Sequence, residues 1–160
     1  MPGDPQRRVG GVASAAGLAT LSGLHAYWAA GGRWPGHDAR SLAETVVGPP
    51  GSAFPSPPVT AAVAALLGVA SASVALTAAD RGGSRLRPLA GAATLTAGSV
   101  LVLRGALAIP LELLRGVDSR FARLDVLFYS PLSLALGVGC LGVADSRSGS
   151  FARVRDALAG

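Results

Sequence analysis

The sequence predicts an all-α polytopic membrane protein, a bundle of four transmembrane helices. Half of its 160 residues are hydrophobic, only 14% are charged, and the mean hydropathy is +0.47, whereas about 25% of a soluble domain is charged. Four apolar runs are long enough to cross a hydrocarbon core of about 30 Å at about 1.5 Å per residue. We expect residues 1–145 to form the membrane domain and 146–160 a short cytoplasmic tail.

The first two runs cover residues 9–30 and 59–79. The first contains no formally charged residue, and Arg7 and Arg8 precede it. A secretory signal would begin in a similar way, but no small-residue cleavage site follows this apolar core, so we interpret it as a span. The second run follows a pair of prolines and is rich in alanine.

The third and fourth runs cover residues 89–109 and 126–144. The third contains Arg104 and is followed by Pro110, and the fourth contains Pro131. A membrane helix tolerates an internal proline when its neighbours satisfy the freed carbonyl group. Pro131 therefore predicts a kink in the fourth helix and not its end.

The longest predicted loop, about 27 residues, connects the first two spans and ends in PPGSAFPSPP. Its prolines favour an extended, polyproline-like chain over a folded domain. At the C-terminus, FARVRDALAG would form either a short surface helix or a frayed tail.

The arginines predict a plasma-membrane topology with both termini in the cytoplasm. With the N-terminus inside, eight of them lie in cytoplasmic segments and five lie outside, as the positive-inside rule requires. The net charge of +5 is scattered along the chain and not gathered in a stripe, so we expect no nucleic-acid partner. The partner that the sequence predicts for the helices is the lipid bilayer.

Small residues recur at the spacing of helix-packing positions, where they let two backbones approach closely. The pairs are Ala13 and Gly17, Ala19 and Gly23, Ala64 and Gly68, and Gly68 and Ala72. This spacing indicates close packing within the bundle, or against a membrane protein partner or a second copy in a homo-oligomer.

The strongest polar and aromatic residues of the spans collect near the outer surface in this topology. Together they form the candidate ligand-binding or structural cluster: His25, Tyr27, Trp28, Arg104, Arg123, Asp125 and Tyr129. Spacings of i, i+3 and i, i+4 place residues on one helix face, so His25 should share a face with Trp28, and Asp125 with Tyr129.

Arg104 is the most informative of these residues, because a charge near the centre of a span costs about 2.5–3.5 kcal/mol. A carboxylate partner would satisfy the guanidinium and fix the third helix against the fourth. Asp125 is the first candidate partner and Glu112 the second. The alternatives are an arginine that binds a ligand in a cavity and one that snorkels to the interface.

Tyr27, Trp28 and Trp34 fit an interfacial aromatic belt, which leaves His25 unexplained. An imidazole in an apolar helix needs a partner, which Asp125, Tyr129 or a backbone carbonyl could supply. His25 is then a satisfied structural residue, a proton or ligand site, or a metal or haem ligand. The last of these is disfavoured because the other histidine, His37, lies in a loop.

These observations favour a non-catalytic accessory or binding module. Cys140 is the only cysteine, which excludes an internal disulfide or a redox pair, and we expect no cofactor and no metal. One alternative is a small transporter or sensor with an anion or proton site lined by Arg, His and Asp. Another is an intramembrane enzyme with His25 and Asp125 as acid and base, although no activated nucleophile or phosphate loop accompanies them.

Four segments carry a family resemblance: HAYWAAGGRWP at 25–35, TVVG at 45–48, LRG at 103–105 and FARLDVLFYSPLSLALG at 121–137. With them the chain resembles, over nearly its whole length, a family of small bacterial four-span membrane proteins catalogued as a domain of unknown function. Its members share a His-x-Tyr-Trp motif and an Arg-x-Asp motif followed by Tyr-Ser-Pro-Leu. They often have leucine where this chain has Ala30 and cysteine where it has Ser133. The resemblance implies an architecture and no activity.

Overall fold

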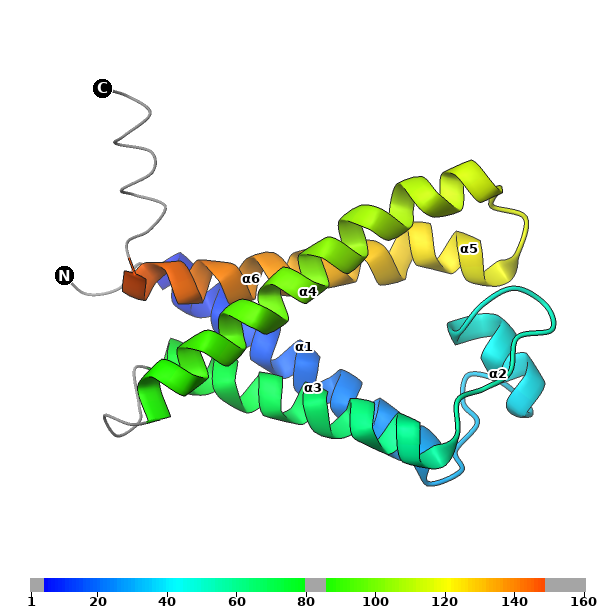
Figure 1. The fold of residues 1–160 in the computed structure, drawn as a ribbon, viewed down its shortest axis with the longest axis horizontal. Helices are drawn as coiled ribbons and strands as arrows, with labels where there is room; N and C mark the ends of the chain where they lie inside the picture. Colours follow the sequence, from blue (N-terminus) through cyan, green and yellow to red (C-terminus); the bar gives the residue numbers. More distant parts are fainter. Residues whose placement is uncertain (1–4, 80–85, 149–160) are drawn as a thin grey trace.

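Four long helices run the length of the molecule (Figure 1) in a computed structural model that describes residues 5–79 and 86–148. They are α1 (Pro5–Ala29), α3 (Pro57–Ala78), α4 (Leu86–Arg115) and α6 (Ser130–Ser148). A short helix α5 (Arg120–Leu124) and a π-helical turn η1 (Asp125–Tyr129) lead directly into α6. The predicted all-α fold is confirmed, because four helical segments are long and apolar enough to cross a membrane.

The four helices form two antiparallel pairs. α1 packs along α3 and α4 packs along α6, while contacts of α1 with α6 and of α3 with α4 join the pairs. The pairs lie together at the end where α1 begins and α6 finishes, and they diverge toward the end that holds α2 (Figure 1). We call these the closed end and the open end.

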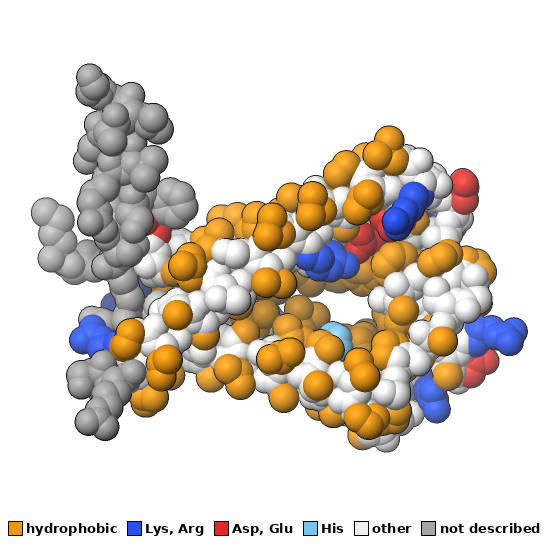
Figure 2. Space-filling model, in the orientation of Figure 1, with side chains coloured by type: hydrophobic (Ala, Val, Ile, Leu, Met, Phe, Trp, Pro, Cys, Tyr) orange, Lys and Arg blue, Asp and Glu red, His pale blue; other side chains and the backbone are white. Residues whose placement is uncertain are grey.

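The outer surface of the helices is apolar along much of its length, as lipid contact requires. Leucines on α3 and α4, for example Leu66 and Leu103, are exposed, and hydrophobic side chains cover much of the face seen in Figure 2. The buried apolar cluster is small and is centred on Leu18, Val74 and Cys140. Close helix contacts must therefore supply much of the packing inside the bundle.

Small hydroxyl side chains join neighbouring helices. Three serines donate to carbonyl groups of another helix, and two threonines pair across α3 and α4. The bonds are Ser14 to Leu136 at 3.1 Å, Ser22 to Ala64 at 2.8 Å, Ser71 to Ala15 at 2.7 Å, and Thr77 with Thr94 at 3.1 Å. Such bonds are typical of membrane helices, where each contributes about 0.6 kcal/mol on average.

Three of the predicted small residues, Gly17, Ala64 and Gly68, lie at helix contacts. A Cβ at Gly17 would lie 2.6 Å from Leu136 of α6, and one at Gly68 would lie 3.2 Å from Ser22 of α1. Gly23, by contrast, has open space around it. The closest backbone approach near the polar cluster is at Gly105, where a Cβ would lie 2.7 Å from the Ser130 carbonyl oxygen.

The GG pair of the first motif ends α1. Gly31 adopts a φ of 95°, and the N–H groups of Gly31 and Gly32 donate to the carbonyls of Trp28 and Tyr27 at 3.0 and 2.9 Å. This is the Schellman arrangement, in which glycine supplies the left-handed conformation. The ring of Tyr27 also occupies the space that a Cβ at Gly32 would fill.

The first loop is extended only in its proline-rich part, because the residues before it form helix α2 (Ala39–Val46), which was not predicted from the sequence. Asp38 caps it by accepting from the Ser41 N–H at 2.7 Å, and this hydrogen bond lowers the pKa of Asp38 from 3.8. Leu42 and Thr45 are buried on its inner face. Capping and one apolar face thus stabilise a helix of only eight residues.

The prolines of the last two spans behave differently from each other. α4 continues through Pro110 to Arg115, beyond the predicted end at residue 109. Pro131 does not stop the fourth helix, as expected, and the turn before it is π-helical. The C-terminal segment FARVRDALAG lies outside the described residues.

Candidate functional site

A π-helical turn positions the acidic residue of the site. The Ser130 N–H donates to the Asp125 carbonyl, five residues back. Pro131 has no N–H, and its ring would crowd the carbonyl four residues earlier in a regular helix, so a wider turn at this point relieves the clash. The same turn brings the side chains of Asp125 and Ser130 together, although i, i+5 residues diverge on an α-helix.

Arg104 of α4 reaches this turn and forms an ion pair with Asp125. Its Nη2 donates to Asp125 Oδ1 at 2.6 Å, which joins α4 to η1 as predicted. The side chain of Asp125 is 2% exposed and that of Arg104 is 41% exposed. The carboxylate is therefore enclosed, while part of the arginine side chain remains accessible.

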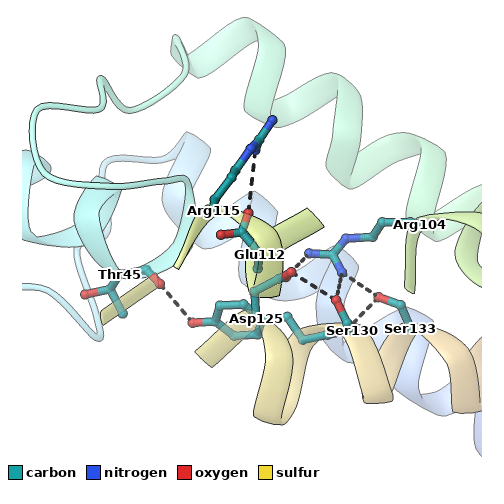
Figure 3. A network of polar contacts seen from close by, with 8 residues as sticks. Thr45, Arg104, Glu112, Arg115, Asp125, Ser130 and Ser133 are labelled. Carbon is teal, nitrogen blue, oxygen red and sulfur yellow. Dashed lines mark hydrogen bonds and ion pairs between the residues drawn. The ribbon is translucent and has the colours of Figure 1, made fainter. Parts of the chain in front are cut away.

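Two serines complete the network around this pair (Figure 3). Ser130 Oγ accepts from Arg104 Nη1 at 3.2 Å and donates to Asp125 Oδ2 at 3.0 Å. Ser133 Oγ accepts from the same Nη1 at 3.4 Å and donates to the Tyr129 carbonyl at 2.8 Å. Both carboxylate oxygens of Asp125 thus have a donor inside the protein.

The other charged residues near the site lie outside this network. Glu112, the second candidate partner of Arg104, instead lies 3.8 Å from Arg115 on its own helix. Arg123 is exposed and makes no side-chain hydrogen bond or ion pair with the described residues. Only Asp125 of the two candidate carboxylates therefore bonds to Arg104.

Tyr129 bonds to a different element from Asp125, although the spacing predicts one shared face. Its hydroxyl donates to the Thr45 carbonyl of α2 at 3.1 Å, while Asp125 bonds to α4. The π-helical turn between the two residues changes the register on which the i, i+4 expectation depends. Tyr129 consequently connects the polar network to the small helix at the open end.

His25 bonds within its own helix and not to the network. Its Nδ1 lies 2.8 Å from the Leu21 carbonyl oxygen, so Nδ1 carries the proton, and Nε2 of the neutral ring is an acceptor. Nε2 has no hydrogen-bond partner among the described residues. Of the three partners that the sequence suggests, the backbone carbonyl is the observed one.

One of the three residues assigned to an aromatic belt, Trp28, does not fit that prediction. Tyr27 and Trp34 are exposed, and the Tyr27 hydroxyl accepts from the Trp34 N–H at 3.4 Å. Trp28, by contrast, is buried. Its Nε1 donates to the Trp34 carbonyl at 2.7 Å, and its ring packs edge-on against His25 and Phe54. Trp28 is therefore an internal anchor for the loop and not a lipid-facing residue.

A partly open cavity of about 290 Å³ lies beside His25 and Trp28. Its walls come from α1, the end of α2, the loop that follows, and the start of α3. The lining residues are His25, Trp28, Val46, Val47, Phe54, Pro55, Val59, Thr60 and Val63. Figure 2 shows the molecule hollowed between its two helix pairs on the open side.

Several residues of the site carry little signal in the sequence. Ser130 and Ser133 are ordinary small residues of a membrane helix, and their role depends on the π-helical turn. Phe54 and Thr60 line the same cavity as His25 because a long loop returns the chain to the side of α1. Within residues 5–79 and 86–148, no group of three His, Cys, Asp or Glu side chains is placed to hold a metal ion.

A family model described as a protein of unknown function (DUF3995) matches residues 18–140. The chain belongs to this family. The match runs from α1 to α6 and includes all seven residues of the predicted cluster. No curated protein and no solved structure matches the chain. Membership of the DUF3995 family thus confirms the resemblance to a domain of unknown function.

Proposed function

We propose that this DUF3995 protein is a non-catalytic binding module of the bacterial plasma membrane. The observation that carries the proposal is the closed network around Asp125, whose two carboxylate oxygens are bonded to Arg104 and Ser130. A catalytic carboxylate must exchange a proton with a substrate, and this one is almost completely enclosed. The charged residues therefore serve to hold the helices, and the cavity beside His25 is left for a ligand.

The topology we propose places both termini in the cytoplasm. With an even number of spans, α1 begins and α6 finishes on the same side of the membrane (Figure 1). The count of eight arginines on that side against five on the other supports a cytoplasmic position for it. The open end with α2 then faces outward. The exposed apolar faces suit lipid, and they equally suit an accessory role beside a membrane protein partner or in a homo-oligomer.

A small transporter or sensor is the second candidate, and one observation favours it. The side chain of Arg104 is 41% exposed. A guanidinium has five N–H donors, and only three of them are used in the bonds to Asp125, Ser130 and Ser133. An anion could approach the remaining donors. The enclosed counter-charge of Asp125 opposes it, and we therefore prefer the binding module.

Thermal unfolding in detergent with added anions distinguishes these two functions. Chloride, sulfate and phosphate are compared at equal ionic strength on the wild type, on Arg104→Gln and on Arg115→Gln, an exposed arginine of the same helix. A structural ion pair predicts the same response of all three proteins to each anion. Stabilisation by one anion that disappears only in Arg104→Gln would establish an anion site and overturn the proposal.

A further inference from the structure

We propose that the cavity beside His25 binds a single-ring phenol or hydroquinone, whose hydroxyl group donates to His25 Nε2. This inference rests on the proposed function as a binding module and names the chemical class of the ligand. Three observations support it: the size of the cavity, the character of its walls, and the free acceptor on the histidine.

The cavity has the size of one substituted aromatic ring. A cavity of about 150 Å³ accommodates benzene, and drug-sized ligands occupy about 300–1,000 Å³. The 290 Å³ beside His25 lie between these cases. A benzene ring with a few small substituents fits this space, which lies at the lower limit for a drug-sized molecule.

The walls are suited to a flat apolar ligand. Two rings, Trp28 and Phe54, lie with their centroids 6.0 Å apart, and Pro55 with four valines supplies most of the remaining surface. Aromatic side chains favour edge-on or offset contacts with a further ring. The Trp28 N–H is already bonded to the Trp34 carbonyl, so the indole offers the ligand apolar surface only.

The polar groups of the walls select a hydrogen-bond donor. Nδ1 of His25 donates to the Leu21 carbonyl, so in the neutral imidazole Nε2 is the acceptor. The Thr60 hydroxyl donates to the Ser56 carbonyl at 3.1 Å, so its proton is also engaged. An apolar ligand with a hydroxyl group would satisfy Nε2, whereas a carboxylate or phosphate would find no cationic side chain among the lining residues.

Quenching of Trp28 fluorescence by a brominated phenol tests this inference. The Trp34→Phe variant leaves Trp28 as the only tryptophan, because the chain has two. It is titrated in detergent micelles with 4-bromophenol and with 4-bromotoluene, in which a methyl group of similar size replaces the hydroxyl. We expect saturable quenching with 4-bromophenol and an affinity about tenfold higher than that for 4-bromotoluene. The difference corresponds to the free energy of one good hydrogen bond.

Three further variants separate the acceptor from the cavity. His25→Phe keeps a ring in place and should remove the preference for the phenol, whereas His37→Phe, in an exposed loop position, should keep it. Val63→Phe fills the cavity without changing His25 and should abolish saturable quenching by both compounds. Circular dichroism and the unfolding midpoint of each variant show that the comparison is made between folded proteins.

Two results would overturn the inference in different ways. Equal, saturable quenching by both compounds, or a phenol preference that survives His25→Phe, would reject the hydroxyl ligand and leave the binding role intact. Quenching that never saturates with either compound would reject the cavity as a binding site and, with it, the proposed binding module.

Discussion

Arg104 and Asp125 are unequal partners, because only Asp125 is enclosed. A buried charge that loses its partner costs about 3–5 kcal/mol, whereas an arginine near an interface can extend its charged group toward water. The side chain of Asp125 is 2% exposed and that of Arg104 is 41% exposed. Loss of the arginine therefore leaves a buried, unpaired carboxylate, which costs more free energy than the partly exposed arginine left by loss of the aspartate. The two serines beside the pair also differ from each other. Ser130 bonds to both Arg104 and Asp125, whereas Ser133 bonds only to Arg104.

Replacement of Ser130 should destabilise the protein more than replacement of Ser133. Ser130 is completely buried and bonds to both members of the ion pair, so Ser130→Ala should lower the free energy of unfolding by about 1–3 kcal/mol. Ser133 has one long bond to Arg104, at 3.4 Å, and Ser133→Ala should cost about 0.5 kcal/mol or less. SDS-induced unfolding in mixed micelles measures both, and an equal or reversed order would contradict this assignment.

The π-helical turn η1 is the element on which the site depends. Hydropathy alone identifies the span that contains it, and the pairing of Arg104 with Asp125 follows from the cost of a lone charge in lipid. The turn itself shifts the register by one residue, and for this reason the sequence does not reveal the roles of Ser130, Ser133 and Tyr129. The helix α2 was missed because it has only eight residues, although its apolar face and its capping residue Asp38 can both be seen in the sequence.

The two helix prolines should respond oppositely to replacement by alanine. Pro131→Ala restores an N–H and allows a regular helix, which would turn Asp125 away from Ser130, so we expect a loss of about 1–2 kcal/mol. Pro110→Ala lies in a helix that is already continuous and should be neutral or stabilising, because it restores a hydrogen bond. Unfolding in the same mixed micelles compares them. A Pro131→Ala protein as stable as the wild type would show that η1 does not hold the site together.

At the scale of the whole molecule, two helix pairs meet at the closed end and diverge at the open end (Figure 1). The Arg104–Asp125 pair ties the helices of one pair together, and the bond from Tyr129 to the Thr45 carbonyl attaches α2 to that pair. Val46 and Val47 at the end of α2 also line the cavity of the other pair. α2 is therefore the connection between the polar network and the cavity. The sequence could not predict this cavity, because Phe54 reaches it through loop geometry.

Removal of the Tyr129 hydroxyl should loosen α2 while the four long helices keep their stability. In Tyr129→Phe, the backbone amides of Leu42 and Thr45 should exchange with deuterium several-fold faster, since one hydrogen bond of about 0.5–1.5 kcal/mol is lost. Tyr27→Phe is the matched control, because its hydroxyl accepts from the Arg33 and Trp34 amides instead. Unchanged exchange in α2 of Tyr129→Phe would show that this bond does not hold the helix.

The central claim is that Arg104 and Asp125 form a structural lock between α4 and η1. The coupling free energy of the pair tests it most directly, from SDS unfolding of the wild type, Arg104→Leu, Asp125→Leu and the double variant. We expect Arg104→Leu to be the less stable single variant. The double variant should be more stable than the sum of the single losses predicts, by a coupling of about 1–3 kcal/mol. Additive losses, with a coupling near zero, would contradict the lock.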